Sequence, residues 1–494
     1  MIQRIKEFLF HNQTIRQTVA KNTFWLTVSN FGGRLFRSII IIYAARVLGT
    51  GPWGVFSYAL SLVAFVTVFS DIGIGNILVR EMAKGRDNID YQRSVLSTAF
   101  YLKMTLLAIG ILLILFVAPH ITKIPEVKII LPIVVFVYVF DTIREFGFSL
   151  IRALEKMEWE AFLYLLTNVA IVACGFVFLS ASKTVTSMTY AYALGAGIGS
   201  FATIIALRNK LKGALSYFSV NVMSSVLKSA WPIAIAAGLG MLMLNADVLI
   251  IGWMRAADDV GLYSAAQRII QLLYILPTIL STSLLPAFSR FAKKDNVRFK
   301  AVLEIILHFA YLLAIPIATG GALLSREIIT FIFGSSYAGA SLSFSILALT
   351  LLIDFPVVIF SNVVFAFDQQ KKLIIYASIG GILNIIFDLL FIPLYGIAGS
   401  AFATLAAQFI SNVYLRRVVK QSIDFHVFGR LKRVFVATAL MSAACIILNM
   451  TGAHILIVVG TGIIIYTTTL LMLKEPIIKE IRSILQPAPS ENAP

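Results

Sequence analysis

Long apolar stretches separated by short polar segments run along the whole chain. Each stretch is close to the roughly 20 residues that an α-helix needs to cross a bilayer. Fourteen membrane-spanning helices are predicted in this way, at 22–47, 54–79, 94–118, 129–151, 160–180, 187–206, 229–254, 260–285, 300–323, 342–366, 373–392, 397–415, 434–450 and 454–473. The pattern predicts an all-α integral membrane protein.

Composition agrees with this class. Hydrophobic residues make up 59% of the 494 residues and charged residues 13%, and the mean hydropathy is +0.89. These values lie outside the range of soluble globular proteins. The two cysteines, Cys174 and Cys445, both fall in predicted spans, which argues against a disulfide framework.

Basic residues are distributed unevenly between the two sets of loops. If the N-terminus is cytoplasmic, the inner loops and both tails hold 30 Lys and Arg residues, and the outer loops hold six. This is the bias of the positive-inside rule, so we expect a multi-pass protein of the cell membrane with both termini in the cytoplasm. The net charge of +17 then reflects topology and contact with membrane lipids, and no nucleic-acid partner is expected.

A weak internal repeat divides the predicted helices into two sets of six. The segment Lys21-Asn-Thr-Phe-Trp25 pairs with Lys228-Ser-Ala-Trp-Pro232 at an offset of 207 residues, and the same offset aligns Gly54-Val-Phe-Ser-Tyr58 with Gly261-Leu-Tyr-Ser-Ala265. Because six helices separate the matches, both halves enter from the same side, as in transporters whose lobes are related by an axis along the membrane normal. The alternative is that any two amphipathic helix-loop-helix segments share Gly and Lys at their ends.

The repeat suggests a domain organisation for the whole chain. We predict an interfacial N-terminal helix at 1–20, an N-lobe of six helices at 21–212 and a C-lobe of six at 213–418. The two additional helices then occupy 419–475, and a cytoplasmic tail occupies 476–494.

Several motifs occur in a characteristic order along both halves. They include Ala45-Arg-Val-Leu-Gly-Thr-Gly-Pro-Trp-Gly54, Asp71-Ile-Gly-Ile-Gly75, Asp247-Val-Leu-Ile-Ile-Gly252 and Ile392-Pro-Leu-Tyr-Gly-Ile-Ala-Gly-Ser-Ala-Phe-Ala-Thr404. With them the chain resembles the oligosaccharide and polysaccharide flippases, the polysaccharide transport family of the multidrug/oligosaccharidyl-lipid/polysaccharide exporter superfamily. The resemblance implies a two-lobe, V-shaped bundle that moves a lipid-linked sugar to the outer leaflet by alternating access.

Arg34 and Arg37 lie one turn apart near the middle of the first apolar stretch. A charge at this depth costs at least about 3 kcal/mol, and such residues usually face a wet interior. With Asn30 one turn earlier they form a polar stripe. Since the planar fork of arginine binds phosphate oxygens in pairs, we interpret the stripe as a site for the phosphate or pyrophosphate headgroup of a lipid-linked oligosaccharide. The alternative is pairing with embedded carboxylates.

Three further basic residues lie inside predicted spans. Arg144 is a second headgroup candidate, although a salt bridge to Asp141 or Glu145 on the same helix is an equal alternative. Arg268 is the nearest counterpart in the second half. Lys103 is expected to extend its side chain to the cytoplasmic interface.

Four acids lie well inside spans, namely Asp71, Asp141, Asp247 and Asp354. They either neutralise the arginines, or one of them binds a coupling Na⁺ or H⁺. Asp247 is the best candidate for coupling because its helix has no basic residue within two turns. Asp388, near the outer end of its helix, is expected to be wetted there.

The sequence predicts a transporter and not an enzyme. No other cofactor or metal is expected, because the histidines show no ligand spacing, and without a phosphate-binding Gly-Lys-Ser/Thr loop ATP is not the direct energy source. Glycan-assembly proteins are possible partners. The alternatives are a cation-coupled multidrug antiporter of the same superfamily and a membrane-bound glycan polymerase or transferase. Two embedded arginines oppose the first, and short outer loops oppose the second.

Overall fold

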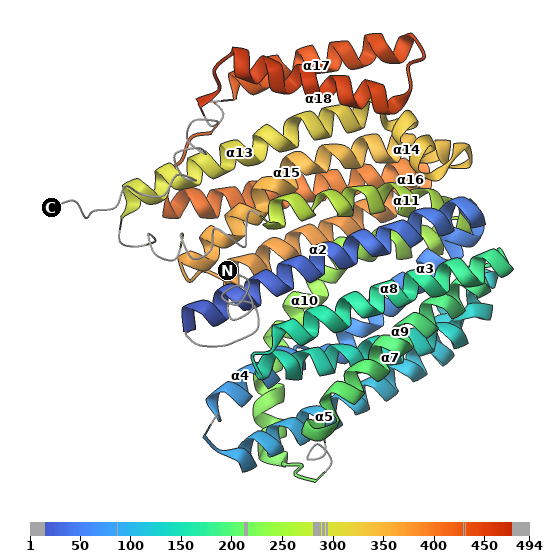
Figure 1. The fold of residues 1–494 in the computed structure, drawn as a ribbon, viewed down its shortest axis with the longest axis vertical. Helices are drawn as coiled ribbons and strands as arrows, with labels where there is room; N and C mark the ends of the chain where they lie inside the picture. Colours follow the sequence, from blue (N-terminus) through green and yellow to red (C-terminus); the bar gives the residue numbers. More distant parts are fainter. Residues whose placement is uncertain are drawn as a thin grey trace, which may run out of the picture. The chain divides into compact units, whose positions relative to one another are not determined.

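The computed structural model describes residues 15–85, 87–211, 216–279, 288, 292, 295–427, 429 and 431–476. Its regular structure is helical, and these described residues form no β-strand. The chain divides into two compact units, Met1–Ala265 with Asp388–Ile397, and Ala266–Phe387 with Ala398–Pro494. The predicted all-α membrane fold is confirmed (Figure 1).

The first unit is formed by helices α2 to α10, the start of α11 and a short part of α16. The helices have the bounds α2 Ile15–Leu48, α3 Thr50–Asp71, α4 Ile74–Lys84, α5 Ile89–Leu112, α6 Ala118–Ile121, α7 Pro125–Ala153, α8 Met157–Ala181, α9 Val185–Leu211 and α10 Val220–Met254, with a π-helical turn at Leu113–Val117 between α5 and α6.

The second unit contains the remainder of α11 and α16 and the helices around them. The bounds are α11 Ala257–Leu273, α13 Asn296–Leu323, α14 Ser325–Phe333, a 3₁₀ helix Ser335–Ala340, α15 Ser341–Ala366, α16 Lys371–Ser422, α17 Lys432–Met450 and α18 Ile455–Met472. Inside α16 the chain leaves helical geometry at Gly396, where φ is 58°, a conformation that glycine adopts readily. The two helices predicted at 373–392 and 397–415 are therefore joined at this break.

The predicted helices agree with the observed ones in position, but the number of membrane spans is not settled. Nine helices of the described chain are long and apolar enough to cross a membrane, or ten if the bent pair Ala237–Met243 and Asn245–Met254 makes one span. Fourteen spans therefore stay a prediction. α2 begins at Ile15, so part of the segment predicted as an interfacial helix continues into the first long helix. Residues 1–14 and the tail from 477 onward lie outside the described residues.

Small residues allow close packing of helices in the first unit. A Cβ added to Gly33 of α2 would lie 2.2 Å from Cε1 of Tyr164, and one on Gly199 of α9 would lie 2.0 Å from Oγ1 of Thr167. Both neighbours belong to α8, so α8 is held closely on two sides. Close approach at small residues is how membrane helices gain packing energy without a hydrophobic driving force between them.

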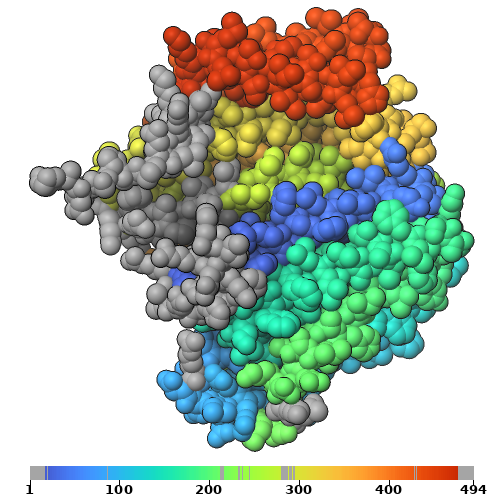
Figure 2. Space-filling view, viewed as in Figure 1, coloured from blue at the N-terminus to red at the C-terminus, as the bar shows by residue number. Residues whose placement is uncertain are grey.

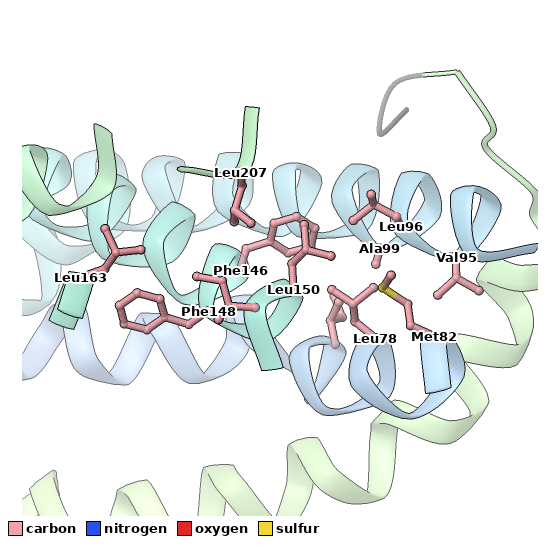
Figure 3. Packing of buried hydrophobic residues seen from close by; sticks show 12 residues of the cluster. Leu78, Met82, Val95, Leu96, Ala99, Phe146, Phe148, Leu150, Leu163 and Leu207 are labelled. Atoms are coloured by element: carbon pink, nitrogen blue, oxygen red, sulfur yellow. The ribbon is translucent and has the colours of Figure 1, made fainter. Parts of the chain in front are cut away.

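An apolar cluster joins five of these helices at one end of the unit. It contains Leu78 and Met82 of α4, and side chains of α5, α7, α8 and α9, all nearly inaccessible to solvent (Figure 3). Large apolar side chains are exposed on other surfaces, as on the α17–α18 pair (red in Figure 2), where Ile464 is 65% exposed. An apolar exterior of this kind suits contact with lipid.

Two glycines that the predicted internal repeat would relate contact each other within the first unit. A Cβ on Gly54 of α3 would lie 1.8 Å from the carbonyl oxygen of Ala257, and a Cβ on Gly261 of α11 would lie 2.0 Å from that of Thr50. Thr50 and Ala257 are themselves separated by the repeat offset of 207 residues. The contact is therefore the same from both sides, as in an isologous interface. The Thr50 hydroxyl also donates a hydrogen bond to Asp258.

Candidate functional site

The two arginines of α2 form no salt bridge within the described part of the chain. Arg34 is exposed. Arg37 is half-buried; its Nε donates to Oδ1 of Asn168 at 3.1 Å, and its Cζ lies 5.9 Å from the ring centroid of Tyr192. An amide and an aromatic face do not neutralise a guanidinium, and the carboxylates of Asp141 and Glu145 act on Arg37 only from beyond salt-bridge distance. Neither arginine is therefore held in a described salt bridge.

The orientation of Arg37 is set by neighbouring helices. Asn168 of α8 is buried, and its Nδ2 donates to the carbonyl oxygen of Tyr164 at 2.7 Å, which leaves Oδ1 directed to Arg37. Gly33, one turn before Arg37, permits the close α2–α8 contact that makes this hydrogen bond possible. Asn30 is exposed on α2 like Arg34, and its amide donates to the carbonyl oxygen of Leu26 at 2.7 Å. The predicted stripe thus has two exposed members and one held in place.

Arg144 is in a different environment. It is only 4% exposed, its Nη1 lies 2.7 Å from Oδ1 of Asp141, and its Nη2 lies 3.8 Å from Glu145. The salt bridge that the spacing on α7 permitted is therefore present. In this geometry the guanidinium is held by carboxylates and covered by protein, so the structure gives no support to a headgroup contact at Arg144.

Other charges of the first unit are also paired. Lys103 is 2% exposed and its Nζ lies 2.5 Å from Oδ1 of Asp71, so the expectation that Lys103 reaches the membrane interface is wrong. Asp71 attracts it inward because an ion pair lowers the cost of charge within the membrane. Arg152 binds Glu160 through two nitrogens, at 2.9 and 2.5 Å. The α2 arginines differ from these pairs because neither forms a described salt bridge.

The remaining acids differ in accessibility and partners. Asp247 is 1% exposed and its Oδ2 accepts a hydrogen bond from the Tyr263 hydroxyl at 2.5 Å. Asp388 is 0% exposed, so the expectation that it is wetted at the end of its helix is wrong: the surrounding helices cover it. In the second unit, Oδ2 of Asp354 accepts from the Tyr274 hydroxyl at 2.7 Å.

Arg268 lies on α11 in the second unit and is half-buried. Its Nη1 donates a hydrogen bond to Oε1 of Gln271 at 3.1 Å. Gln271 follows Arg268 by one turn, so this hydrogen bond lies along the helix surface. Arg268 keeps its place as a candidate from the sequence.

The second unit also contains an apolar pocket of about 810 Å³. Its wall is formed by α11, α13, α15, α17 and α18, and by the start of α14; representative lining residues are Leu273, Phe309, Pro316, Phe344, Met441 and Ile463. The size falls within the range of small-molecule and lipid sites, which are lined mainly by apolar groups. Among the described residues, no group of three or more His, Cys, Asp and Glu side chains is arranged to hold a metal ion.

Sequence reasoning missed the partners of the embedded charges. Asn168 is a neutral polar residue in the middle of an apolar stretch, and this was a signal of the same kind as Arg37, although weaker. Tyr274, the partner of Asp354, has no such signal because tyrosine is common in membrane helices. Neither pairing follows from spacing, since 131 residues separate Arg37 from Asn168 and 80 separate Tyr274 from Asp354.

Comparison with known proteins agrees with this architecture. Over 91% of its length the chain superimposes on 99% of a solved chain described as lipid II flippase MurJ in an inward closed conformation, with a TM-score of 0.75 and 20% identity. An inward-facing multidrug transporter of the MATE family gives a TM-score of 0.64 with 12% identity over 79% of this chain and 98% of that one. These similarities show the fold.

Sequence relatives and a family model cover most of the chain. A probable low-salt glycan biosynthesis flippase, Agl15 of Haloferax volcanii, is 22% identical over 92% of this chain and 96% of its own. A putative O-antigen transporter of Shigella flexneri is 21% identical over 65% of this chain and 78% of its own. The model of the family described as polysaccharide biosynthesis protein matches residues 19–292, more than half of the chain. The chain therefore belongs to the polysaccharide biosynthesis protein family, and its resemblance to the polysaccharide flippases is confirmed.

Proposed function

We propose that this protein moves a lipid-linked oligosaccharide, attached to polyprenyl phosphate or pyrophosphate, from the cytoplasmic to the outer leaflet for cell-surface polysaccharide biosynthesis. The movement proceeds by alternating access and is transport, not catalysis. Two curated relatives named as a probable glycan flippase and a putative O-antigen transporter support this proposal, as does the similarity in fold to a lipid II flippase.

The α2 arginines are the observation that favours an anionic cargo. Arg34 is exposed, and Arg37 is held by an amide and an aromatic ring. A polar headgroup has to cross about 30 Å of hydrocarbon, and fixed guanidinium groups replace part of its hydration. Arginine suits phosphate because it offers two parallel N–H donors to two oxygens. Asn30 and Arg268 are the further polar side chains that we assign to headgroup binding.

The apolar pocket of the second unit suits the other part of the cargo. A polyprenyl chain is apolar along its length, and the pocket of about 810 Å³ is lined almost entirely by aliphatic and aromatic side chains. We assign the prenyl chain to this pocket. The sugar then needs no specific apolar contact with the protein.

Membrane potential provides a driving force in the proposed direction. With both termini cytoplasmic, as the 30 inner and six outer basic residues indicate, export of one negative charge gains about 2.3 kcal/mol per 100 mV of inside-negative potential. A coupling Na⁺ or H⁺ then mainly resets the empty carrier. Asp247, which accepts a hydrogen bond from Tyr263, and Asp354, which accepts one from Tyr274, are the candidate acids for this coupling.

A multidrug antiporter is the nearest alternative, since the MATE transporter shares the fold. Drugs of that class are commonly cations, and the α2 arginines, which form no described salt bridge, would repel them. A glycan polymerase or transferase would need a reactive centre outside the hydrocarbon region.

The experiment that tests the proposed function replaces the two arginines. Arg34→Ala combined with Arg37→Ala should abolish surface glycan display in cells and flipping of lipid-linked oligosaccharide in reconstituted vesicles, with a normal amount of protein in the membrane. Lys183→Ala removes an exposed loop charge and should leave both readouts unchanged. Unimpaired display by the double variant would remove the arginines from the transport path.

A further inference from the structure

Asp354 lies in the middle of α15 and differs from the other acids of the second unit. Its Oδ2 accepts a hydrogen bond from the hydroxyl of Tyr274 at 2.7 Å. Thr350, one turn earlier on α15, lies beside both the carboxylate and the Tyr274 hydroxyl. Tyr274 directly follows the last residue of α11, Leu273. The hydrogen bond therefore joins the centre of one membrane helix to the end of another.

No basic side chain neutralises Asp354 within the described part of the chain. Asp71 and Asp141 are paired with Lys103 and Arg144, whereas the groups that face Asp354 are hydroxyls: Tyr274 after α11, Thr350 on α15 and Tyr376 on α16. A carboxylate at the centre of a membrane helix with only neutral partners is costly. Binding a proton removes that charge.

Partial exposure of Asp354 and the groups that hydrogen-bond to it favour a proton as the bound ion. Asp354 is half-buried, whereas Asp247 and Asp388 are covered by protein. Tyr274 directs its hydroxyl hydrogen at the carboxylate, and a donor in that position opposes a metal cation. A proton needs a single oxygen, whereas a sodium ion needs several oxygen ligands with free lone pairs.

A second acceptor lies next to Tyr274. The amide of Gln408 on α16 lies beside the Tyr274 hydroxyl; the residue is 5% exposed, and its Oε1 has no hydrogen-bond partner among the described residues. A half-turn of the amide would bring this oxygen to the hydroxyl. The Tyr274 hydroxyl thus has two neighbouring acceptors. The carboxylate of Asp354 is charged and accepts its hydrogen bond now, whereas the amide oxygen of Gln408 is neutral and accepts none from the described residues.

We propose that Asp354 is the site that binds and releases the coupling proton. Tyr274 transmits the change to α11 by moving the hydrogen bond of its hydroxyl from Asp354 to Gln408. A proton from water forms an O–H bond on the carboxylate, which becomes neutral and loses its charge-assisted hydrogen bond from Tyr274. Tyr274 then donates to Gln408. Release of the proton to water restores the first arrangement. α11 also carries Arg268, six residues before Tyr274. The change of hydrogen-bond partner therefore acts on a helix that we assign to headgroup binding, and in this respect the inference rests on the proposed function.

Infrared difference spectroscopy of the purified protein tests proton binding without transport. As the pH falls, one component of the carboxyl C=O band should be missing in Asp354→Asn. Asp424→Asn, which removes an acid that is 67% exposed, should retain that component. Tyr274→Phe should bind the proton roughly tenfold more tightly, because the ionised form loses a donor. A spectrum that is the same in the wild-type protein and Asp354→Asn would overturn the proposal.

Vesicle measurements then separate this proposal from the flipping function. With lipid-linked oligosaccharide as the probe, a proton gradient should accelerate wild-type flipping at least threefold, and Asp354→Asn should flip at the basal rate with no response to the gradient. Acceleration by a sodium gradient that Asp354→Asn abolishes would overturn proton coupling at this site. If the wild-type protein flips no substrate, the proposed function fails, and the infrared result alone decides on the proton site.

Discussion

The hydroxyl of Tyr466 donates a hydrogen bond to the backbone carbonyl of Leu312 at 2.6 Å. Pro316 follows Leu312 by four residues within α13 and has no N–H to offer that carbonyl. In apolar surroundings an unsatisfied carbonyl costs several kcal/mol. α18 thus supplies the donor that α13 lacks, and it does so in the wall of the apolar pocket, to which all three residues contribute.

Removal of this hydroxyl should destabilise the protein. Tyr466→Phe keeps the ring and leaves the Leu312 carbonyl unpaired, so we expect the free energy of unfolding to fall by roughly 1–2 kcal/mol. Thermal unfolding in detergent measures the change. Thr467→Val is the matched control, because the Thr467 hydroxyl bonds to the Ile463 carbonyl of its own helix at 2.7 Å and that carbonyl keeps its helical donor.

A double-mutant cycle identifies the cause of that loss. In a Pro316→Ala background the restored N–H pairs the Leu312 carbonyl, so Tyr466→Phe should cost about 1 kcal/mol less than in the natural background. An equal cost in both backgrounds would show that Tyr466 acts through packing and not through the carbonyl.

The glycine contact at the start of α3 and α11 should tolerate no side chain. Thr50→Cys and Asp258→Cys, placed where the native side chains share a hydrogen bond, should form a disulfide in a protein whose Cys174 and Cys445 are replaced by Ser. Adding Gly54→Ala should reduce the cross-linked fraction several-fold, because its Cβ would lie 1.8 Å from a backbone oxygen.

The control for this measurement is Gly460→Ala on α18, whose added Cβ would meet nothing within 4 Å. It should cross-link as the parent does. A Gly54→Ala protein with the parental yield would mean that the backbones separate without consequence for the contact.

Arg144 should affect stability through Asp141. Arg144→Ala leaves Asp141 without the Nη1 partner it has at 2.7 Å, and breaking such a pair by removing one member costs about 3 kcal/mol. Adding Asp141→Asn should recover part of that loss. Arg34→Ala should change the unfolding free energy by less than about 0.5 kcal/mol, because the side chain is exposed. Chemical denaturation of the three variants decides; an Arg144→Ala protein as stable as the natural one contradicts the structural role.

Local properties of the chain predicted the helices, because apolar length and loop charge are set within each segment. The α2 arginines were found for the same reason: a charge in an apolar stretch is visible without knowledge of its neighbours. What surrounds each charge was not predictable, because it depends on which helix faces meet. Lys103 was assigned to the interface although Asp71 holds it inside, and Asp388 was assigned to water although it is 0% exposed. Both errors concern contacts between separate helices.

The contact between Gly54 and Gly261 is made of main chain on both sides. Each glycine lies against the carbonyl oxygen of the first residue of the other glycine's helix. Side chains in contact can change rotamer when two helices shift, whereas backbone atoms in contact have no such freedom. Even a partial separation of the two helices would remove both of these backbone contacts. Separation of α3 and α11 at this point therefore requires both backbone contacts to open together.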